Sequence, residues 1–264
     1  MNPGYSRVVN PTGPDGPLCT VLNCSTVLKE LTQPENLSET LPTALETAAE
    51  SGFTAVELWW PFATPTPTDT ALNDFIDAIT SAPVRLIAMN SWGGDMPAGE
   101  RGVLHREALP TAHFDALRRI ADATGLRFTN TLLGASGDAV TDTQREHLAA
   151  WVNTLAEVGV QPLVEPMSAT PNYPVTCPWA AEDLARETGA GVLLDFYHLA
   201  VNGVDVEKWL TDVETGAVSM PAHVQLADAP GRGAPGTGEA PLQKWVSRLR
   251  TAGYRGDVAA EWTG

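Results

Sequence analysis

Short apolar runs alternate with longer amphipathic stretches along nearly the whole chain of 264 residues. The apolar runs have the length of buried strands, and they lie at 18–23, 54–60, 84–89, 127–133, 161–165, 191–195, 221–226 and 257–261. The stretches between them predict helices at about 34–51, 69–81, 109–124, 141–158, 178–188, 204–215 and 240–252. The pattern therefore predicts eight strands, each after the first preceded by a helix.

This alternation indicates a closed (β/α)8 barrel, a TIM barrel, in one domain that covers residues 18–264. Eight parallel units with short, fully buried strands favour closure over an open sheet. No Gly-x-Gly-x-x-Gly follows the first strand, so a dinucleotide site has no support. The last strand runs almost to the terminus, so we expect the closing helix to be absent. Residues 1–17 are rich in Pro, Gly and Asn and predict an extended N-terminal arm.

The four predicted strands in the second half of the chain each have an acid or an amide at their carboxyl end. The residues are Glu165, Asp195, Gln225 and Glu261, separated by steps of 30, 30 and 36 residues. The carboxyl ends of barrel strands meet at one mouth, so these side chains are expected to converge there. Three carboxylates at one point need either protonation or a bound divalent cation, because they cannot all stay ionised unaided. The all-oxygen set selects Mg²⁺ or Mn²⁺ over Zn²⁺.

Other side chains are expected near the same mouth as candidate substrate contacts. His198 lies three residues beyond the aspartate of the sixth strand, and His223 alternates with the glutamine of the seventh. Each imidazole either supports the site or is a structural residue. Asn90 opens a long loop at 90–108, and loops of this length are usually functional. Trp59 adds bulk at the end of the second strand, where an indole either packs the loop or walls a sugar-like ring.

Composition narrows the class of protein. Hydrophobic residues make up 43% of the chain and charged residues 18%, which is ordinary for a globular enzyme. A net charge of −16 repels polyanions, so we expect no nucleic-acid partner. No apolar run approaches the ~20 residues of a membrane span, and the first residues lack the apolar core of a secretion signal. Cys19, Cys24 and Cys177 form neither a disulfide framework nor a zinc spacing, which fits a reducing cytoplasm.

Several motifs together resemble the hydroxypyruvate isomerase branch of the xylose isomerase-like barrels, a group of sugar phosphate isomerases and epimerases. The motifs are Gly52-Phe-Thr-Ala-Val-Glu57, Ala98-Gly-Glu-Arg-Gly102, Asn130-Thr-Leu-Leu-Gly134, Leu163-Val-Glu165-Pro, Asp195-Phe-Tyr-His198, His223-Val-Gln225-Leu-Ala-Asp228, Pro230-Gly-Arg232, Pro235-Gly-Thr-Gly-Glu239 and Glu261-Trp. The resemblance covers about residues 18–262, and the stretch from Arg232 to Glu239 is its most specific part.

The resemblance implies a barrel that acts on a small hydroxy-carbonyl compound with a divalent metal held by the four strand-end residues. It implies that Glu165 and Glu261 exchange the proton and that His198 and Arg232 hold substrate oxygens. The planar fork of Arg232 suits a carboxylate. The expected reaction is an isomerisation or epimerisation through an enediolate, and the nearest named activity converts hydroxypyruvate to tartronate semialdehyde. The sequence does not say which glutamate is the base.

Two other functions stay open at this point. One is a dehydratase or lyase that expels water from an inosose- or sugar-derived ketone at the same metal site, and the other is a non-catalytic barrel subunit. The loop at 167–174 departs from the family pattern, and no basic residue lies between Glu165 and Arg186, which leaves the substrate open. The only partner that we expect besides a small-molecule substrate is a second copy in a homo-oligomer.

Overall fold

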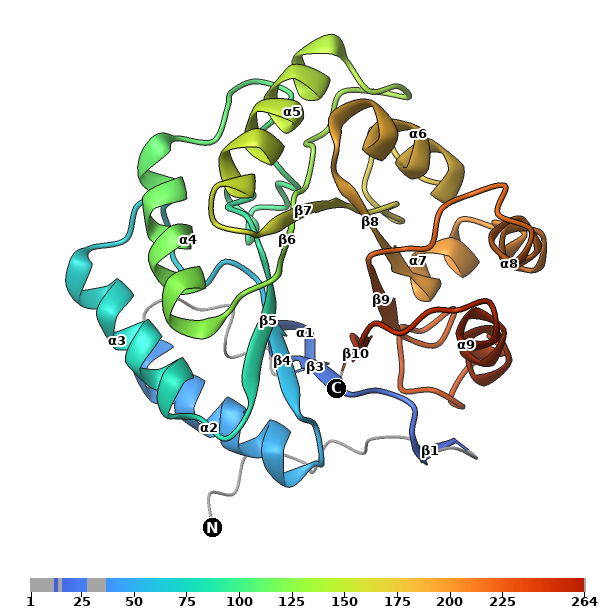
Figure 1. The fold of residues 1–264 in the computed structure, drawn as a ribbon, viewed down its shortest axis with the longest axis horizontal. Helices are drawn as coiled ribbons and strands as arrows, with labels where there is room; N and C mark the ends of the chain where they lie inside the picture. The colour runs from blue at the N-terminus through green and yellow to red at the C-terminus, as the bar shows by residue number, and fades with distance from the viewer. Residues whose placement is uncertain (1–11, 14–15, 28–36, 264) are drawn as a thin grey trace.

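The computed structural model describes residues 12–13, 16–27 and 37–263, and it contains a closed barrel of eight parallel strands. The strands follow the order β10-β3-β4-β5-β6-β7-β8-β9 around the barrel (Figure 1). Their bounds are β3 Val21–Asn23, β4 Ala55–Leu58, β5 Arg85–Asn90, β6 Phe128–Asn130, β7 Gln161–Val164, β8 Gly191–Asp195, β9 His223–Leu226 and β10 Val258–Ala260. The pairing of β10 with β3 closes the sheet and confirms the predicted (β/α)8 fold.

Helices cover the outside of the barrel (Figure 1). Their bounds are α2 Leu37–Glu50, α3 Asp69–Ser81, α4 Thr111–Thr124, α5 Asp142–Ala156, α6 Pro178–Thr188, α8 Val206–Glu214 and α9 Leu242–Thr251. Local sequence determines several of their ends. Thr141 and Gln144 form a capping box at the start of α5, and Gly189 ends α6 with a left-handed φ of 82°.

An apolar layer fills the inside of the barrel below its mouth. It consists of Val21, Ala55, Ile87, Ala88, Phe128, Leu163, Leu193 and Ala259. Strand β9 contributes His223 instead, which is fully buried and stacks on Phe128 with 5.6 Å between ring centroids. Side chains alternate between the two faces of a strand, so a residue two positions further along points inward as well. On every strand a polar residue occupies that position.

The structure corrects several predicted boundaries and adds two short helices. The short helix α7, Phe196–Val201, follows β8 directly because the Asp195 side chain accepts a hydrogen bond from the Tyr197 backbone N–H and caps it. A four-residue helix, α1 Cys24–Val27, follows β3 in the same way. Helix α4 begins after the predicted residue 109, since Pro110 is extended, with φ −70° and ψ 150°. Strand β6 ends before the predicted residue 133, because the chain leaves the sheet after Asn130.

The structure describes the two ends of the chain only in part, and its terminal strands are shorter than the predicted runs at 18–23 and 257–261. Within the predicted N-terminal arm, β1 Thr12–Gly13 pairs antiparallel with β2 Gly16–Pro17. The rest of 1–17, apart from these pairs, and the helix start predicted near Pro34 lie outside the described residues. No helix follows β10 in the described part of the chain, which ends at Thr263. Among the described helices, none combines the length and the apolar character that crossing a membrane requires.

Candidate active site

Eight polar side chains form a ring at the carboxyl ends of the strands, above the apolar layer. In strand order they are Asn23, Glu57, Asn90, Asn130, Glu165, Asp195, Gln225 and Glu261. All of them are buried except Asn90, which is half-buried. Burying polar groups is unfavourable unless each finds a partner. The hydrogen bonds within the ring therefore show which polar atoms are satisfied by the protein and which still lack a partner.

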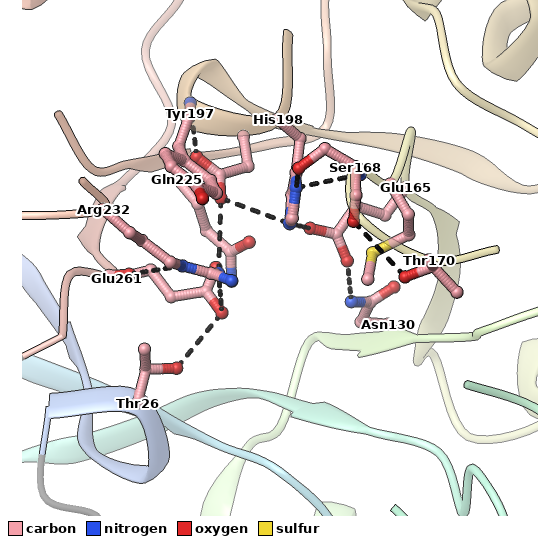
Figure 2. A network of polar contacts seen from close by, with 12 residues as sticks. Thr26, Asn130, Glu165, Ser168, Thr170, Tyr197, His198, Gln225, Arg232 and Glu261 are labelled. Carbon is pink, nitrogen blue, oxygen red and sulfur yellow. Dashed lines mark hydrogen bonds and ion pairs between the residues drawn. The ribbon is translucent and has the colours of Figure 1, made fainter. Parts of the chain in front are cut away.

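Glu165 and Asp195 each have one carboxylate oxygen fixed by a hydrogen bond, and Figure 2 shows the one between Asn130 and Glu165. Asn130 Nδ2 donates to Glu165 Oε2 at 2.6 Å. The backbone N–H of Tyr197 donates to Asp195 Oδ1 at 2.9 Å. The other oxygens, Glu165 Oε1 and Asp195 Oδ2, lie 3.6 Å and 3.7 Å from His198 Nε2. Each carboxylate is thus held from one side and presents its second oxygen to the middle of the mouth.

Gln225 and Glu261 are arranged in the same way, with one terminal atom held by the protein and the other left without a partner in the part of the chain that the structure describes. Gln225 Nε2 donates to Glu57 Oε1 at 2.6 Å. Glu261 Oε1 accepts from Thr26 Oγ1 at 3.2 Å and lies 3.0 Å from Arg232 Nη2 (Figure 2). The remaining atoms, Gln225 Oε1 and Glu261 Oε2, are buried and have no hydrogen-bond partner among the described residues. The same is true of Asp195 Oδ2.

The carboxyl groups hold protons more tightly here than in water. Burial raises the pKa of Glu165 to about 8, and the neighbouring Asp195 carboxylate adds to the rise. Burial also raises the pKa of Asp195 to about 6, although Arg232 and the Tyr197 N–H act in the opposite direction. Burial places the pKa of Glu261 well above its ordinary value. Without a cation the cluster therefore retains protons near neutral pH.

His198 presents a proton, rather than a lone pair, to the site. The backbone N–H of Ser168 donates to His198 Nδ1 at 3.0 Å, and the Ser168 hydroxyl lies 2.6 Å from the same nitrogen (Figure 2). A backbone N–H can only donate, so Nδ1 carries the lone pair and Nε2 carries the proton. Burial lowers the pKa of His198 to about 3, with a further contribution from Arg232, so the ring stays neutral. His198 is consequently a hydrogen-bond donor at the mouth.

Arg232 is the counter-charge of the cluster. Its Nη2 lies 3.0 Å from Glu261 Oε1 and 3.6 Å from Asp195 Oδ2, and its guanidinium packs 5.0 Å from the Tyr197 ring centroid. Its backbone φ of 54° is a strained value for a residue with a side chain. The N–H and hydroxyl of Thr263 hold this conformation by donating to Arg232 O at 2.8 and 3.1 Å.

The loop that carries Arg232 is built on Asp228. The Asp228 carboxylate accepts backbone N–H groups of Gly236 at 2.8 Å and Ala240 at 3.0 Å, which ties the two ends of the loop together. Gly238 packs so closely that a Cβ there would lie 2.2 Å from the backbone oxygen of Ala229. The Pro-Gly-Thr-Gly-Glu motif thus has a backbone role, and it sets the position of the arginine.

The remaining predicted substrate contacts lie at different depths. His223 is fully buried in the apolar layer, below the mouth, and its Nε2 lies 2.8 Å from Glu57 Oε2. Asn90 is half-buried and lines a small internal cavity next to Asn130 and Gln225. Trp59 is half-buried just after β4. Glu165, Asp195, His198 and Arg232 are brought together, whereas His223 stands one layer beneath them.

The donor set fits a divalent cation. Three buried oxygens without partners, on Asp195, Gln225 and Glu261, represent an unfavourable arrangement that a cation would relieve. Suitable ligand atoms of Glu165, Asp195 and His198 also lie within 4.8 Å of one another. The proton on His198 Nε2 argues against that imidazole as a ligand, so the amide oxygen of Gln225 is the better fourth donor. Oxygen donors alone suit a hard ion such as Mg²⁺ or Mn²⁺.

Sequence reasoning missed several residues that hold the site in place. They are Thr26, Glu57, Asn130, Ser168 and Tyr197. A weaker signal existed for two of them, because Glu57 and Asn130 are polar residues inside the predicted strands 54–60 and 127–133. Thr26 and the backbone N–H groups of Ser168 and Tyr197 carry no comparable signal, since their roles depend on closure of the barrel and on local backbone direction.

Comparisons with known proteins identify the family. The family model described as "Xylose isomerase-like TIM barrel" matches residues 45–264, and the chain belongs to this family. It is 36% identical to a putative hydroxypyruvate isomerase of Streptomyces coelicolor over 234 residues, 81% of this chain and 82% of that protein. It is 26% identical to a 2-oxo-tetronate isomerase of Pectobacterium atrosepticum over 231 residues, 81% of this chain and 83% of that protein. The names of both relatives agree with the predicted isomerase.

A solved structure supports the fold over almost the whole chain. It is that of an AP endonuclease, family 2, from Brucella melitensis, which superposes with a TM-score of 0.76. Sequence identity is 24%, and the match covers 93% of each chain. At this identity the likeness shows the shared barrel and carries no argument about activity. The family and fold predicted from the sequence are confirmed.

Proposed function

We propose that this chain is a divalent-metal-dependent isomerase or epimerase of a small hydroxy-carbonyl compound. The observation that carries the proposal is the shared pattern on β7–β10, where each side chain is held through one polar atom and directs a second one inward. Family membership and the names of the two relatives support the reaction class. Hydroxypyruvate, which would become tartronate semialdehyde, is the first substrate to test, and 2-oxo-tetronate is the second.

Glu165 and Glu261 are the proposed proton-transfer pair. They follow β7 and β10, which flank β8 and β9, so they approach a substrate above the site from two sides. One carboxylate takes the proton from the carbon beside the carbonyl and leaves an enediolate. A carboxylic acid then returns a proton to the former carbonyl carbon, while the hydroxyl proton passes to the former carbonyl oxygen. A positioned group of this kind typically contributes about 10²–10⁴-fold to the rate.

The remaining groups bind and orient the substrate. A divalent cation, when bound, would polarise the carbonyl and offset the charge of the carboxylates. His198 donates the Nε2 proton to a substrate oxygen, and its tautomer is fixed by Ser168. Arg232 offers a planar pair of donors that matches the carboxylate of a 2-oxo acid. Its stacking on Tyr197 limits the directions in which the guanidinium can turn.

The test is a substrate panel followed by NMR in deuterated water. It contains hydroxypyruvate, 2-oxo-tetronate, ketoses and an inosose, each with protein treated with a chelator and then resupplied with Mn²⁺ or Mg²⁺. We expect isomerisation with solvent deuterium incorporated at the reacting carbon, abolished by the chelator and restored by the metal. Loss of water from the inosose would identify a dehydratase instead. Turnover that is unaffected by the chelator would contradict the metal requirement.

A further inference from the structure

Glu57 is a buried carboxylate that neither the proton transfer nor the proposed metal ligands use. It is the last inward-facing residue of β4, and only 2% of its surface is exposed. Three nitrogen atoms surround it, namely Asn23 Nδ2 at 3.3 Å, His223 Nε2 at 2.8 Å and Gln225 Nε2 at 2.6 Å. Such a site suits a carboxylate, because its two oxygens can accept hydrogen bonds from all three nitrogen atoms.

Gln225 differs from the other three strand-end residues in having two unlike terminal atoms. A carboxylate presents an oxygen whichever way it turns, whereas an amide presents either an oxygen or an NH₂ group of nearly the same shape. Only the oxygen can bind a cation. Gln225 therefore needs a neighbour that distinguishes its two ends, and Glu57 is that neighbour, 2.6 Å from Nε2.

The layer beneath keeps Glu57 in place. His223 is fully buried, stacks on Phe128 at 5.6 Å between centroids, and contacts Glu57 Oε2. Its Nδ1 has no hydrogen-bond partner among the described residues, which agrees with the proton residing on Nε2. This arrangement leaves Glu57 Oε1 directed at Gln225 and Asn23.

We propose that Glu57 is a positioning residue that turns the amide of Gln225 so that its oxygen, and not its NH₂ group, faces the divalent cation. The inference rests on the proposed metal site and adds to it a determinant of metal affinity from the opposite half of the barrel. It also assigns His223 a role, since the imidazole holds Glu57 from below. Partners that orient metal ligands typically change affinity about 10–100-fold when removed.

The test measures Mn²⁺ binding to metal-free protein without substrate, by calorimetry and by the electron paramagnetic resonance signal of free Mn²⁺. Glu57→Met removes every acceptor at nearly constant length, and we expect Mn²⁺ to bind about 10–100-fold more weakly. Thr26→Val is the matched control, because it removes a hydrogen bond to Glu261, whose two oxygens are equivalent. We expect the control to lose less than the Glu57 variant.

A swapped pair makes the test independent of how well Glu57→Met folds. In the double variant Glu57→Gln with Gln225→Glu, the new amide donates to the new carboxylate and still accepts from His223. The new carboxylate at position 225 presents an oxygen to the cation in either orientation. We expect this variant to fold and to bind Mn²⁺ within about tenfold of the wild type. Its folding is checked by near-ultraviolet circular dichroism.

The outcomes separate this inference from the proposed function. Wild-type protein that binds Mn²⁺ no better than Asp195→Asn would overturn both. Wild-type binding that Asp195→Asn destroys but folded Glu57→Met keeps within about threefold would overturn the role of Glu57 alone. A folded double variant that binds no Mn²⁺ would also contradict it, because the swap preserves the donor–acceptor pair.

Discussion

The two halves of the barrel contribute opposite chemistry to the same mouth. Strands β3–β6 end in three amides and one acid, whereas β7–β10 end in three acids and one amide. The first half supplies Asn130 and Glu57, which hold Glu165 and Gln225, and the second half supplies three buried oxygens without a hydrogen-bond partner among the described residues, on Asp195, Gln225 and Glu261. The single acid of the first half contacts the single amide of the second. One half thus positions the side chains with which the other half is proposed to bind and react.

The largest effect is expected from the proposed proton-transfer pair in the second half. Glu165→Gln or Glu261→Gln should lower kcat by about 10²–10⁴-fold, because each removes a group that carries the proton. The fold should remain, since an amide fills the same space. Steady-state kinetics and circular dichroism check this. A folded variant with wild-type kcat would remove that glutamate from the mechanism.

The pH dependence of thermal unfolding tests the buried carboxyl groups that distinguish the second half from the first. In the folded metal-free protein Glu165 keeps its proton up to about pH 8, whereas an ordinary glutamate loses it near pH 4.5. The folded state therefore binds more protons than the unfolded state between these two pH values. The contribution of Glu165 to the free energy of unfolding is fully present below pH 4.5 and is lost as the pH rises to about 8. Thermal unfolding should show this fall without metal, and Mn²⁺ should raise Tm more at pH 8 than at pH 5.

The result that would contradict this prediction is a Tm of the metal-free protein that does not change with pH. If metal-free protein unfolded at the same temperature from pH 5 to pH 8, the buried carboxyls would not exchange protons on folding. Glu165→Gln provides the control, because it removes the titrating group and should flatten the curve in part.

A smaller loss is expected from a holding residue of the first half. Asn130→Ala removes the donor to Glu165 Oε2 but leaves both carboxylate oxygens in place. We expect kcat/KM to fall about 10–100-fold, the usual cost of losing a partner that orients a functional group. A loss as large as that of Glu165→Gln would mean that Asn130 itself contacts the substrate.

The smallest effect is expected at Thr26. Thr26→Val removes one hydrogen bond to Glu261 Oε1, which Arg232 continues to contact. We expect a loss of about 1 kcal/mol in the free energy of unfolding and a fall in kcat of less than about tenfold. Denaturant titration and kinetics measure both. A larger fall in kcat than that of Asn130→Ala would reverse the predicted order.

The sequence predicts one half of this comparison far better than the other. Acids after apolar runs stand out as chemical groups, so Glu165, Asp195 and Glu261 were identified from spacing. Asn23, Asn130 and Asn90 end their strands in the same way, but an asparagine after a strand is also a common turn residue. The role of Glu57 depends on closure of the barrel, which leaves only β10 and β3 between β9 and β4, and spacing does not contain this information.

Local backbone features were beyond the reach of periodicity. Helix α7 has six residues, too few for a helical pattern, and depends on capping by Asp195. The placement of Arg232 depends on Thr263, which is remote in sequence, and on side-chain to backbone hydrogen bonds of Asp228 within its own loop. The tautomer of His198 follows from the direction of one backbone N–H. These features arise from tertiary contacts, whereas strand order and layer pattern follow from alternation along the chain.

The most direct test of the central claim is anomalous diffraction from crystals soaked in Mn²⁺. We predict one manganese peak, within about 2.0–2.3 Å of oxygens from Glu165, Asp195, Gln225 and Glu261. Side chains of β3–β6 should hold these ligands without contacting the ion. A peak ligated by His198 Nε2 or by a residue of the first half, or no peak at this mouth, would contradict the account.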